Sequence, residues 1–116
     1  MHELAITQGI VDVCQEHARG RRVLEVVLEI GELAGVVPES VEFCFSAVTS
    51  GTLLEGARLV IQRIPGRGRC ASCCAEFGRS TYFDPCPECG GYQVEVLAGE
   101  ELRVKELDLD EEEAQS

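Results

Sequence analysis

The sequence of 116 residues lacks any long hydrophobic run. None of its apolar stretches approaches the ~20 residues that a membrane-spanning helix needs. Its first residues, Met1-His2-Glu3-Leu4, do not follow the basic-then-apolar plan of a secretory signal. We therefore expect a cytoplasmic protein that does not associate with membranes.

Basic residues are also scarce, since ten Lys and Arg stand against 21 Asp and Glu, for a formal net charge of -11. The C-terminal segment is especially acidic, and we expect residues 109–116 to be a disordered acidic tail. A nucleic-acid interface needs clustered Lys and Arg to contact phosphates. Here only a small patch is available, made of Arg67, Arg69 and Arg79. The charge distribution argues against nucleic-acid binding.

Catalytic motifs are absent as well. The sequence has no Ser/His/Asp set, no nucleotide-binding loop and no spaced pair of carboxylates. We therefore expect a binding protein and not an enzyme. A hydrophobic content of 45% nevertheless indicates a globular chain with a modest core. The length suits one domain, or one small domain with a metal-clipped insertion.

Cysteine, in contrast, is abundant, with seven in this short chain. Two Cys-x-x-Cys pairs, Cys70/Cys73 and Cys86/Cys89, have the separation of a four-thiolate zinc site. Four protein ligands on a tetrahedral ion leave no position for water or substrate, so the spacing predicts structural zinc. The alternatives are two redox pairs or an iron site of the rubredoxin type. Redox pairs normally open a helix after a strand, which favours zinc.

The other cysteines and the second histidine have less specific settings. Cys74, beside the first pair, is either a spare thiol or an alternate ligand, and a spare thiol is favoured. Cys14 and Cys44 lie on the apolar faces of predicted helices and are expected in the core. His17 shares the face of Cys14, and we expect it half-buried near the helix C-terminus, where the helix dipole favours a positive charge.

Hydrophobic periodicity predicts the order helix, strand, helix, strand, zinc ribbon, strand. The helices are expected over residues 4–18, with Ile6, Ile10, Val13, Cys14 and His17 on one face, and over residues 38–50, with Pro38 at the first position. Strands are expected at residues 23–30, 59–64 and 101–107, with a further short candidate at 93–97.

This order predicts an α+β fold in which two helices pack on a small three-stranded sheet and a four-cysteine zinc ribbon is inserted before the last strand. We assign residues 1–66 and 93–108 to the α+β domain and residues 67–92 to the zinc ribbon.

The N-terminal Met1-His2-Glu3 supports a second metal-binding hypothesis. Initiator methionine is normally kept before a residue as bulky as histidine, so we expect a free α-amine at Met1. This amine, the His2 amide nitrogen and the His2 imidazole can close adjacent chelate rings on one ion, with Glu3 or water completing the set. Deprotonated amides favour nickel(II) or copper(II) over zinc(II), and cytosolic copper is mostly Cu(I), so nickel is favoured. The alternative is a frayed, solvated terminus.

Several motifs together resemble the HypA/HybF family of hydrogenase-maturation nickel metallochaperones. The resemblance covers nearly the whole chain except the acidic tail, and it rests on Met1-His2-Glu3-Leu4 before a short helix, residues 29–36, residues 45–52, and the cysteine ribbon that ends at Cys89-Gly90. Two positions depart from the family pattern. Ser40 stands where some relatives have an acidic residue, and Cys74 is an additional cysteine.

The resemblance implies that Met1 and His2 are nickel ligands with Glu3 beside them, and that Cys70, Cys73, Cys86 and Cys89 hold structural zinc. It further implies delivery of Ni(II) to the large subunit of a [NiFe]-hydrogenase, with a partner GTPase of the HypB type. We expect at most weak self-association. The alternative hypothesis is a zinc-ribbon adaptor that binds protein or nucleic acid and has an inert N-terminus.

Overall fold

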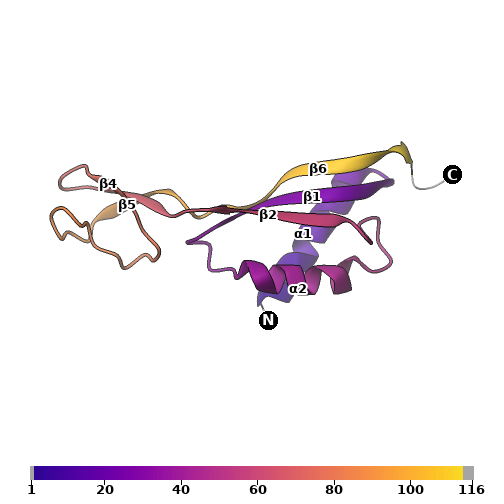
Figure 1. Cartoon of the computed structure of the whole chain (residues 1–116), viewed down its shortest axis with the longest axis horizontal. Coiled ribbons are helices and arrows are strands. Elements are labelled where there is room, and N and C mark those ends of the chain that lie inside the picture. Colours follow the sequence, from indigo (N-terminus) through magenta and orange to yellow (C-terminus); the bar gives the residue numbers. More distant parts are fainter. Residues whose placement is uncertain (1, 114–116) are drawn as a thin grey trace. The chain divides into compact units, whose positions relative to one another are not determined.

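The computed structural model describes the backbone of residues 2–113 and the side chains of residues 3–111. Two three-stranded sheets are formed, with strand orders β2-β1-β6 and β4-β3-β5. In chain order the elements are α1 (His2–Ala18), β1 (Arg21–Gly31), α2 (Pro38–Thr49), β2 (Arg58–Ile64), β3 (Arg67–Cys70), β4 (Glu76–Gly78), β5 (Val94–Ala98) and β6 (Leu102–Glu113) (Figure 1). The predicted α+β fold, with the cysteine ribbon before the last strand, is confirmed.

The chain divides into two compact units. The second unit consists of Ile30–Gly35 and Arg63–Leu102, and the first contains the rest of the described residues. The second unit is thus larger than the ribbon of residues 67–92 that we expected. It gains β5, which pairs with β3 and not with the first sheet, and it gains a segment ahead of α2.

Both helices of the first unit lie on the same side of the sheet β2-β1-β6 (Figure 1). The buried face of α1 differs from the predicted one, because Val13 is 46% exposed and His17 is exposed. Thr7 can lie in the core because its hydroxyl donates to the carbonyl of Glu3. The buried residues of α1 recur at spacings of one, three and four, and they are Thr7, Ile10, Val11, Cys14 and Ala18.

The second helix follows the prediction closely. Pro38 occupies its first turn, where a missing N–H costs no hydrogen bond. Val41, Phe45 and Thr49 are buried, and the Thr49 hydroxyl donates to the Phe45 carbonyl. Val41 and Phe45 thus form the buried side of α2, whereas Cys44, which we expected in the core, is only partly buried.

Strand β1 is the central strand of the first sheet. The predicted alternation holds for Val26, Leu28 and Ile30, which are all buried, whereas Leu24 near the start of the strand is exposed. The intervening acids form ion pairs with the two neighbouring strands, Glu25 with Arg58 of β2 and Glu29 with Arg103 of β6. One face of β1 thus packs in the core, and on its other face these acids alternate with Val23 and Val27, which are also buried.

The last strand is longer than predicted. We expected disorder from residue 109 onward, but β6 continues to Glu113. Residues 107–110 alternate Leu-Asp-Leu-Asp, and this period of two suits a half-buried edge strand despite the density of acids. The prediction is therefore wrong for residues 109–113, while residues 114–116 lie outside the described part of the chain.

Three glycines of the second unit approach one another too closely for any side chain. A Cβ atom on Gly31 would lie 2.0 Å from the carbonyl oxygen of Gly99, and one on Gly99 would lie 2.6 Å from the Cα of Gly66. The Gly31 and Leu33 amides donate to the Glu101 and Gly99 carbonyls, each at 2.7 Å. The segment Ile30–Gly35 is therefore bonded into this unit.

Glu32 completes these contacts. Its amide donates to the Ile64 carbonyl at 2.8 Å, and its carboxylate accepts the amide of Gly66 at 2.9 Å. The side chain and backbone of Glu32 thus hold two segments of the second unit together. Among the described residues, no helix is long and apolar enough to cross a membrane.

Two glycine substitutions should have opposite effects on stability. Gly9→Ala lies within α1 with nothing within 4 Å of the added Cβ, so we expect it to raise the free energy of unfolding by about 0.5–1 kcal/mol. Gly31→Ala forces a clash with backbone and should lower it by at least about 2 kcal/mol. Urea unfolding followed by circular dichroism and by tyrosine fluorescence measures both, because both tyrosines lie in the second unit. Equal effects of the two variants would contradict the close approach at Gly31.

Candidate metal centre

The two Cys-x-x-Cys segments fold into turns with the same hydrogen bonds. The amide of Cys74 donates to the Cys70 carbonyl at 2.9 Å, and in the second turn the amide of Gly90 donates to the Cys86 carbonyl at 2.8 Å. In each turn the amide of the first cysteine also donates to the carbonyl of the residue five positions later, Ala75 in the first turn and Gly91 in the second. Cys74 and Gly90 therefore occupy equivalent positions, and both have left-handed backbones, with φ of 66° and 75°.

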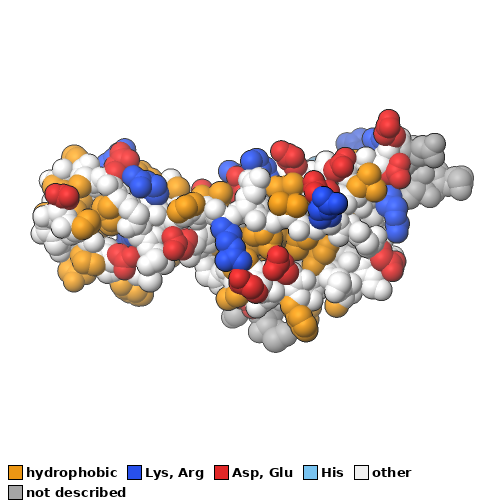
Figure 2. Space-filling view, in the orientation of Figure 1, with side chains coloured by type: hydrophobic (Ala, Val, Ile, Leu, Met, Phe, Trp, Pro, Cys, Tyr) orange, Lys and Arg blue, Asp and Glu red, His pale blue; other side chains and the backbone are white. Residues whose placement is uncertain are grey.

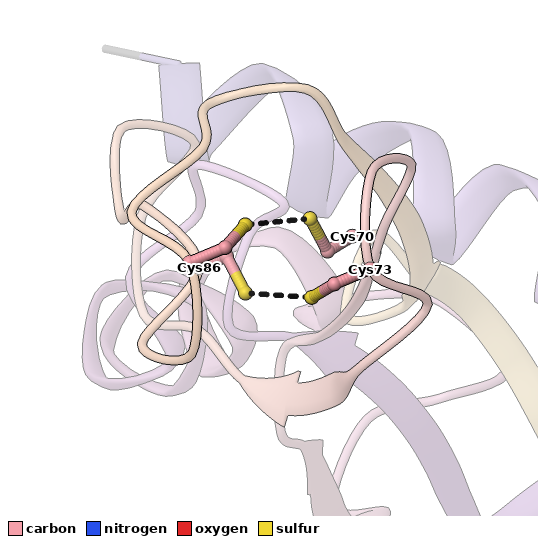
Figure 3. A group of neighbouring side chains, drawn as sticks. Cys70, Cys73 and Cys86 are labelled. Atoms are coloured by element: carbon pink, nitrogen blue, oxygen red, sulfur yellow. Dashed lines mark hydrogen bonds between the residues drawn. The ribbon is translucent and has the colours of Figure 1, made fainter.

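These turns bring four sulfur atoms together. All Sγ atoms of the cluster Cys70, Cys73, Cys86 and Cys89 lie within 4.8 Å of one another. The pairs Cys70/Cys89 and Cys73/Cys86 are separated by 3.5 and 3.6 Å across the two turns (Figure 3). A tetrahedral zinc ion with Zn–S bonds of ~2.3 Å requires sulfur atoms about 3.8 Å apart. The cluster therefore fits a four-thiolate zinc ion, which would be structural because the four cysteines fill its coordination shell.

The backbone already favours one thiolate in this cluster. Hydrogen bonds from the backbone N–H groups of Cys73 and Ser72 lower the pKa of Cys70 to about 6. Cys70 and Cys86 are buried, whereas Cys73 and Cys89 are exposed, so the cluster lies at the surface with one thiol of each turn facing inward. A bound divalent cation would deprotonate the remaining thiols by its own charge.

The other three cysteines lie outside this cluster. Burial raises the pKa of Cys14 to about 11, so this thiol is an inert core group, as predicted. Cys74 is exposed on the turn, with its thiol outside the set of four. Among the described residues, no other group of three or more His, Cys, Asp and Glu side chains is close enough to hold one metal ion.

Of the three predicted N-terminal nickel-site residues, only Glu3 has a described side chain. Met1 and the side chain of His2 are outside the described part of the structure. The helix begins at His2 and not at Leu4, so Glu3 lies in the first turn and is not part of an exposed lead-in. The first amide N–H groups of a helix have no acceptor within it, which leaves these nitrogens available for other bonds.

The start of α1 lies beside α2. Glu3 and Leu4 share a shallow surface depression with four α2 residues, namely Glu39, Ser40, Phe43 and Cys44. No local signal in the sequence connects Glu39 or Cys44 with Glu3, because their proximity depends on how the two helices pack. His17, the other histidine of the sequence, donates from Nδ1 to the Val13 carbonyl and belongs to the other end of the helix.

Comparison with known proteins decides the family. The family model described as "Hydrogenase/urease nickel incorporation, metallochaperone, hypA" matches residues 1–109. The chain belongs to the HypA family. The hydrogenase maturation factor HypA of Geobacter sulfurreducens is 66% identical over 110 residues, which cover 95% of this chain and all of that protein. HypA of Nostoc punctiforme is 47% identical over 111 residues, which cover 96% of this chain and 97% of that protein.

Solved HypA structures share the fold. The solution structure of the nickel metallochaperone HypA from Helicobacter pylori has a TM-score of 0.66 at 22% identity, covering 92% of this chain and 96% of that chain. A second solution structure of a HypA protein has a TM-score of 0.68 at 24% identity, covering 97% of this chain and 98% of that chain. The chain is therefore a maturation factor of the HypA family, with nickel as the cargo of that family and a four-cysteine site that fits structural zinc.

The left-handed position at Cys74 yields a test of the zinc site. A residue with a Cβ atom costs about 1–2 kcal/mol in this conformation, so replacing Cys74 with Gly removes that cost. Part of the stability gained is offset by the greater flexibility of glycine in the unfolded chain. We expect Cys74→Gly to bind one zinc and to unfold at a free energy about 0.5–1 kcal/mol higher, as measured by tyrosine fluorescence in urea.

Cys73→Ser, one residue earlier, is the matched control and should bind zinc much more weakly because it removes a ligand. Gly90→Ala, at the equivalent position of the second turn, should lower the free energy of unfolding by about 1 kcal/mol. Loss of zinc from Cys74→Gly would mean that Cys74, and not only the cluster of four, coordinates the metal.

Proposed function

We propose that this chain is a nickel carrier that binds Ni(II) through Met1 and His2, with Glu3 beside them, and delivers it for the maturation of a [NiFe]-hydrogenase. The observation that carries the proposal is the start of α1 at His2. A metal that replaces the protons of the first amides breaks no helical hydrogen bond, because these N–H groups have no acceptor within the helix. The terminal residues of a HypA-family chain thus offer nitrogen ligands at little structural cost.

The charges around this terminus support the same ion. A helix N-terminus carries a partial positive charge, which favours deprotonated amides but opposes a bare cation. The carboxylates of Glu3 and Glu39 face the same depression and offset this effect for a divalent ion. Neither α1 nor α2 contains Lys or Arg, so no fixed positive side chain of either helix competes with the metal.

Zinc has a separate role in this proposal. We assign Cys70, Cys73, Cys86 and Cys89 to structural zinc, because four thiolates complete a tetrahedral shell and leave nothing to exchange. Nickel would be exchanged instead at an open site whose remaining positions are filled by water or by a ligand of the recipient.

The recipient and the partners follow from the same proposal. The recipient would be the hydrogenase large subunit, and a GTPase of the HypB type would assist the transfer. The carrier itself would catalyse no reaction. The compartment would be the cytoplasm, where reduced cysteines remain available for the zinc site.

Nickel calorimetry on untagged, zinc-loaded protein tests the proposal. We expect one tightly bound nickel ion per wild-type chain. In His2→Ala the nickel affinity should fall by at least the ~10–100-fold that is common when a metal site is altered. A variant with one extra residue ahead of Met1 should lose affinity too, because the α-amine no longer closes the chelate ring. Mass spectrometry of each protein verifies its first residue.

His17→Ala is the matched control, since His17 is the only other histidine and lies at the far end of α1. Its nickel affinity should equal that of the wild type, and all variants should keep one zinc. Equal binding by wild type and His2→Ala would move the nickel site to the cysteines or the acidic β6. Absence of nickel binding in the wild type would instead favour the zinc-ribbon adaptor, which should be indifferent to the N-terminal extension.

A further inference from the structure

The loop of residues 80–84, which we call the aromatic loop, is held from within by a buried arginine. Arg79 is only 4% exposed. Its guanidinium donates to three backbone carbonyls, those of Thr81 at 3.0 Å, Tyr82 and Asp84. A charged side chain is costly to bury unless it is fully hydrogen-bonded, so these three bonds fix the path of the loop.

Asp84 fixes the same loop from its other end. Its carboxylate accepts hydrogen bonds from the amide of Ser80 at 2.9 Å and from the hydroxyl of Thr81 at 3.0 Å. These bonds, led by the Ser80 amide, lower the pKa of Asp84. The Thr81 hydroxyl in turn accepts the amide of Phe83 at 3.1 Å. The backbone of the aromatic loop is thus ordered by polar contacts alone.

The side chains that this ordered loop presents are aromatic and exposed. Phe83 is 84% exposed and Tyr82 is 49% exposed, and Tyr82 is held in place by a hydrogen bond from its hydroxyl to Glu100. Tyr92, which follows the second cysteine turn, is 76% exposed. Hydrophobic side chains gather over the part of the second unit that carries β4, β5 and the cysteine turns (Figure 2). Ordered, exposed aromatics of this kind are typical of binding surfaces.

The exposed charges of the aromatic loop and the second cysteine turn have a single sign. Residues 80–93 contain Asp84 and Glu88 and no Lys or Arg. The nearby arginines are already paired or buried: Arg67 and Arg69 pair with Glu76 at 3.8 and 3.1 Å, Arg69 also pairs with Glu95 at 3.6 Å, and Arg79 is buried. A zinc ion with four thiolates would add two further negative charges. This surface therefore repels phosphates and attracts cationic groups.

We propose that the aromatic loop is a docking surface for a partner protein that presents Lys or Arg around an apolar pocket. Phe83 enters the pocket, and the basic rim pairs with Asp84 and Glu88 and lies over the exposed tyrosine rings. Because the loop is already ordered, docking loses little conformational entropy. The surface is separate in sequence from the N-terminal nickel ligands, so docking and metal transfer use different residues.

The choice of test partners rests on the proposed function. Biolayer interferometry with the zinc-loaded chain would measure the affinity of two purified proteins of the same organism, the HypB-type GTPase and the precursor of the hydrogenase large subunit. Phe83→Ala should weaken binding of at least one of them by tenfold or more. Raising the salt concentration should weaken wild-type binding, because the rim contacts are charged.

Leu24→Ala is the control, since Leu24 is also an exposed large hydrophobic residue, at 46%, but lies on β1 in the first unit and outside the depression beside Glu3. It should change the affinity for the same partner less than twofold. Both variants should keep one zinc and wild-type nickel affinity, so a failed nickel site and a failed docking surface are distinguished. Unchanged partner affinity in Phe83→Ala, equal losses in both variants, competition by RNA, or no binding to either protein would overturn the proposal.

Discussion

The second unit depends on the cluster of four cysteines, because little else holds it together. Its fully buried apolar residues are few, and two of them, Cys70 and Cys86, are members of the cluster itself. Burial of apolar surface therefore provides only a small part of its stability. Structural zinc binds free thiolates with apparent free energies of about 10–16 kcal/mol, which is enough to replace a hydrophobic core in a unit of this size.

Three glycines and one acidic residue hold the other segments of this unit together. Gly31, Gly66 and Gly99 allow three chain segments to approach closely, and Glu32 joins two of them through its side chain. The segment Ile30–Gly35 thereby belongs to the unit that contains the cysteines, although the residues on both sides of it belong to the first unit.

Local signals in the sequence were sufficient for the cysteine cluster, the two helices and the strands β1 and β2. Spacing fixes the metal ligands because each Cys-x-x-Cys turn is a local structure. The core face of α1 was mispredicted because Thr7 hides its hydroxyl in a bond to the helix backbone, which polarity alone does not reveal. Strands β3 and β4 carry Gly, Arg and Glu in place of β-branched residues and are formed by pairing with each other and with β5. The close approach of the three glycines and the proximity of Glu3 to Glu39 depend on tertiary packing and have no local signal.

We propose two separate metal sites, with zinc on the four cysteines and nickel on the N-terminal nitrogens. X-ray absorption at the nickel edge of protein loaded with one zinc and one nickel tests this claim most directly, because sulfur is distinguished from nitrogen and oxygen in the first shell. We predict nickel surrounded by nitrogen and oxygen only, with a tetragonal or square-planar spectrum, and zinc surrounded by four sulfur atoms. Sulfur ligands on nickel would contradict the claim, because they would place the cargo on the cysteines that the fold requires.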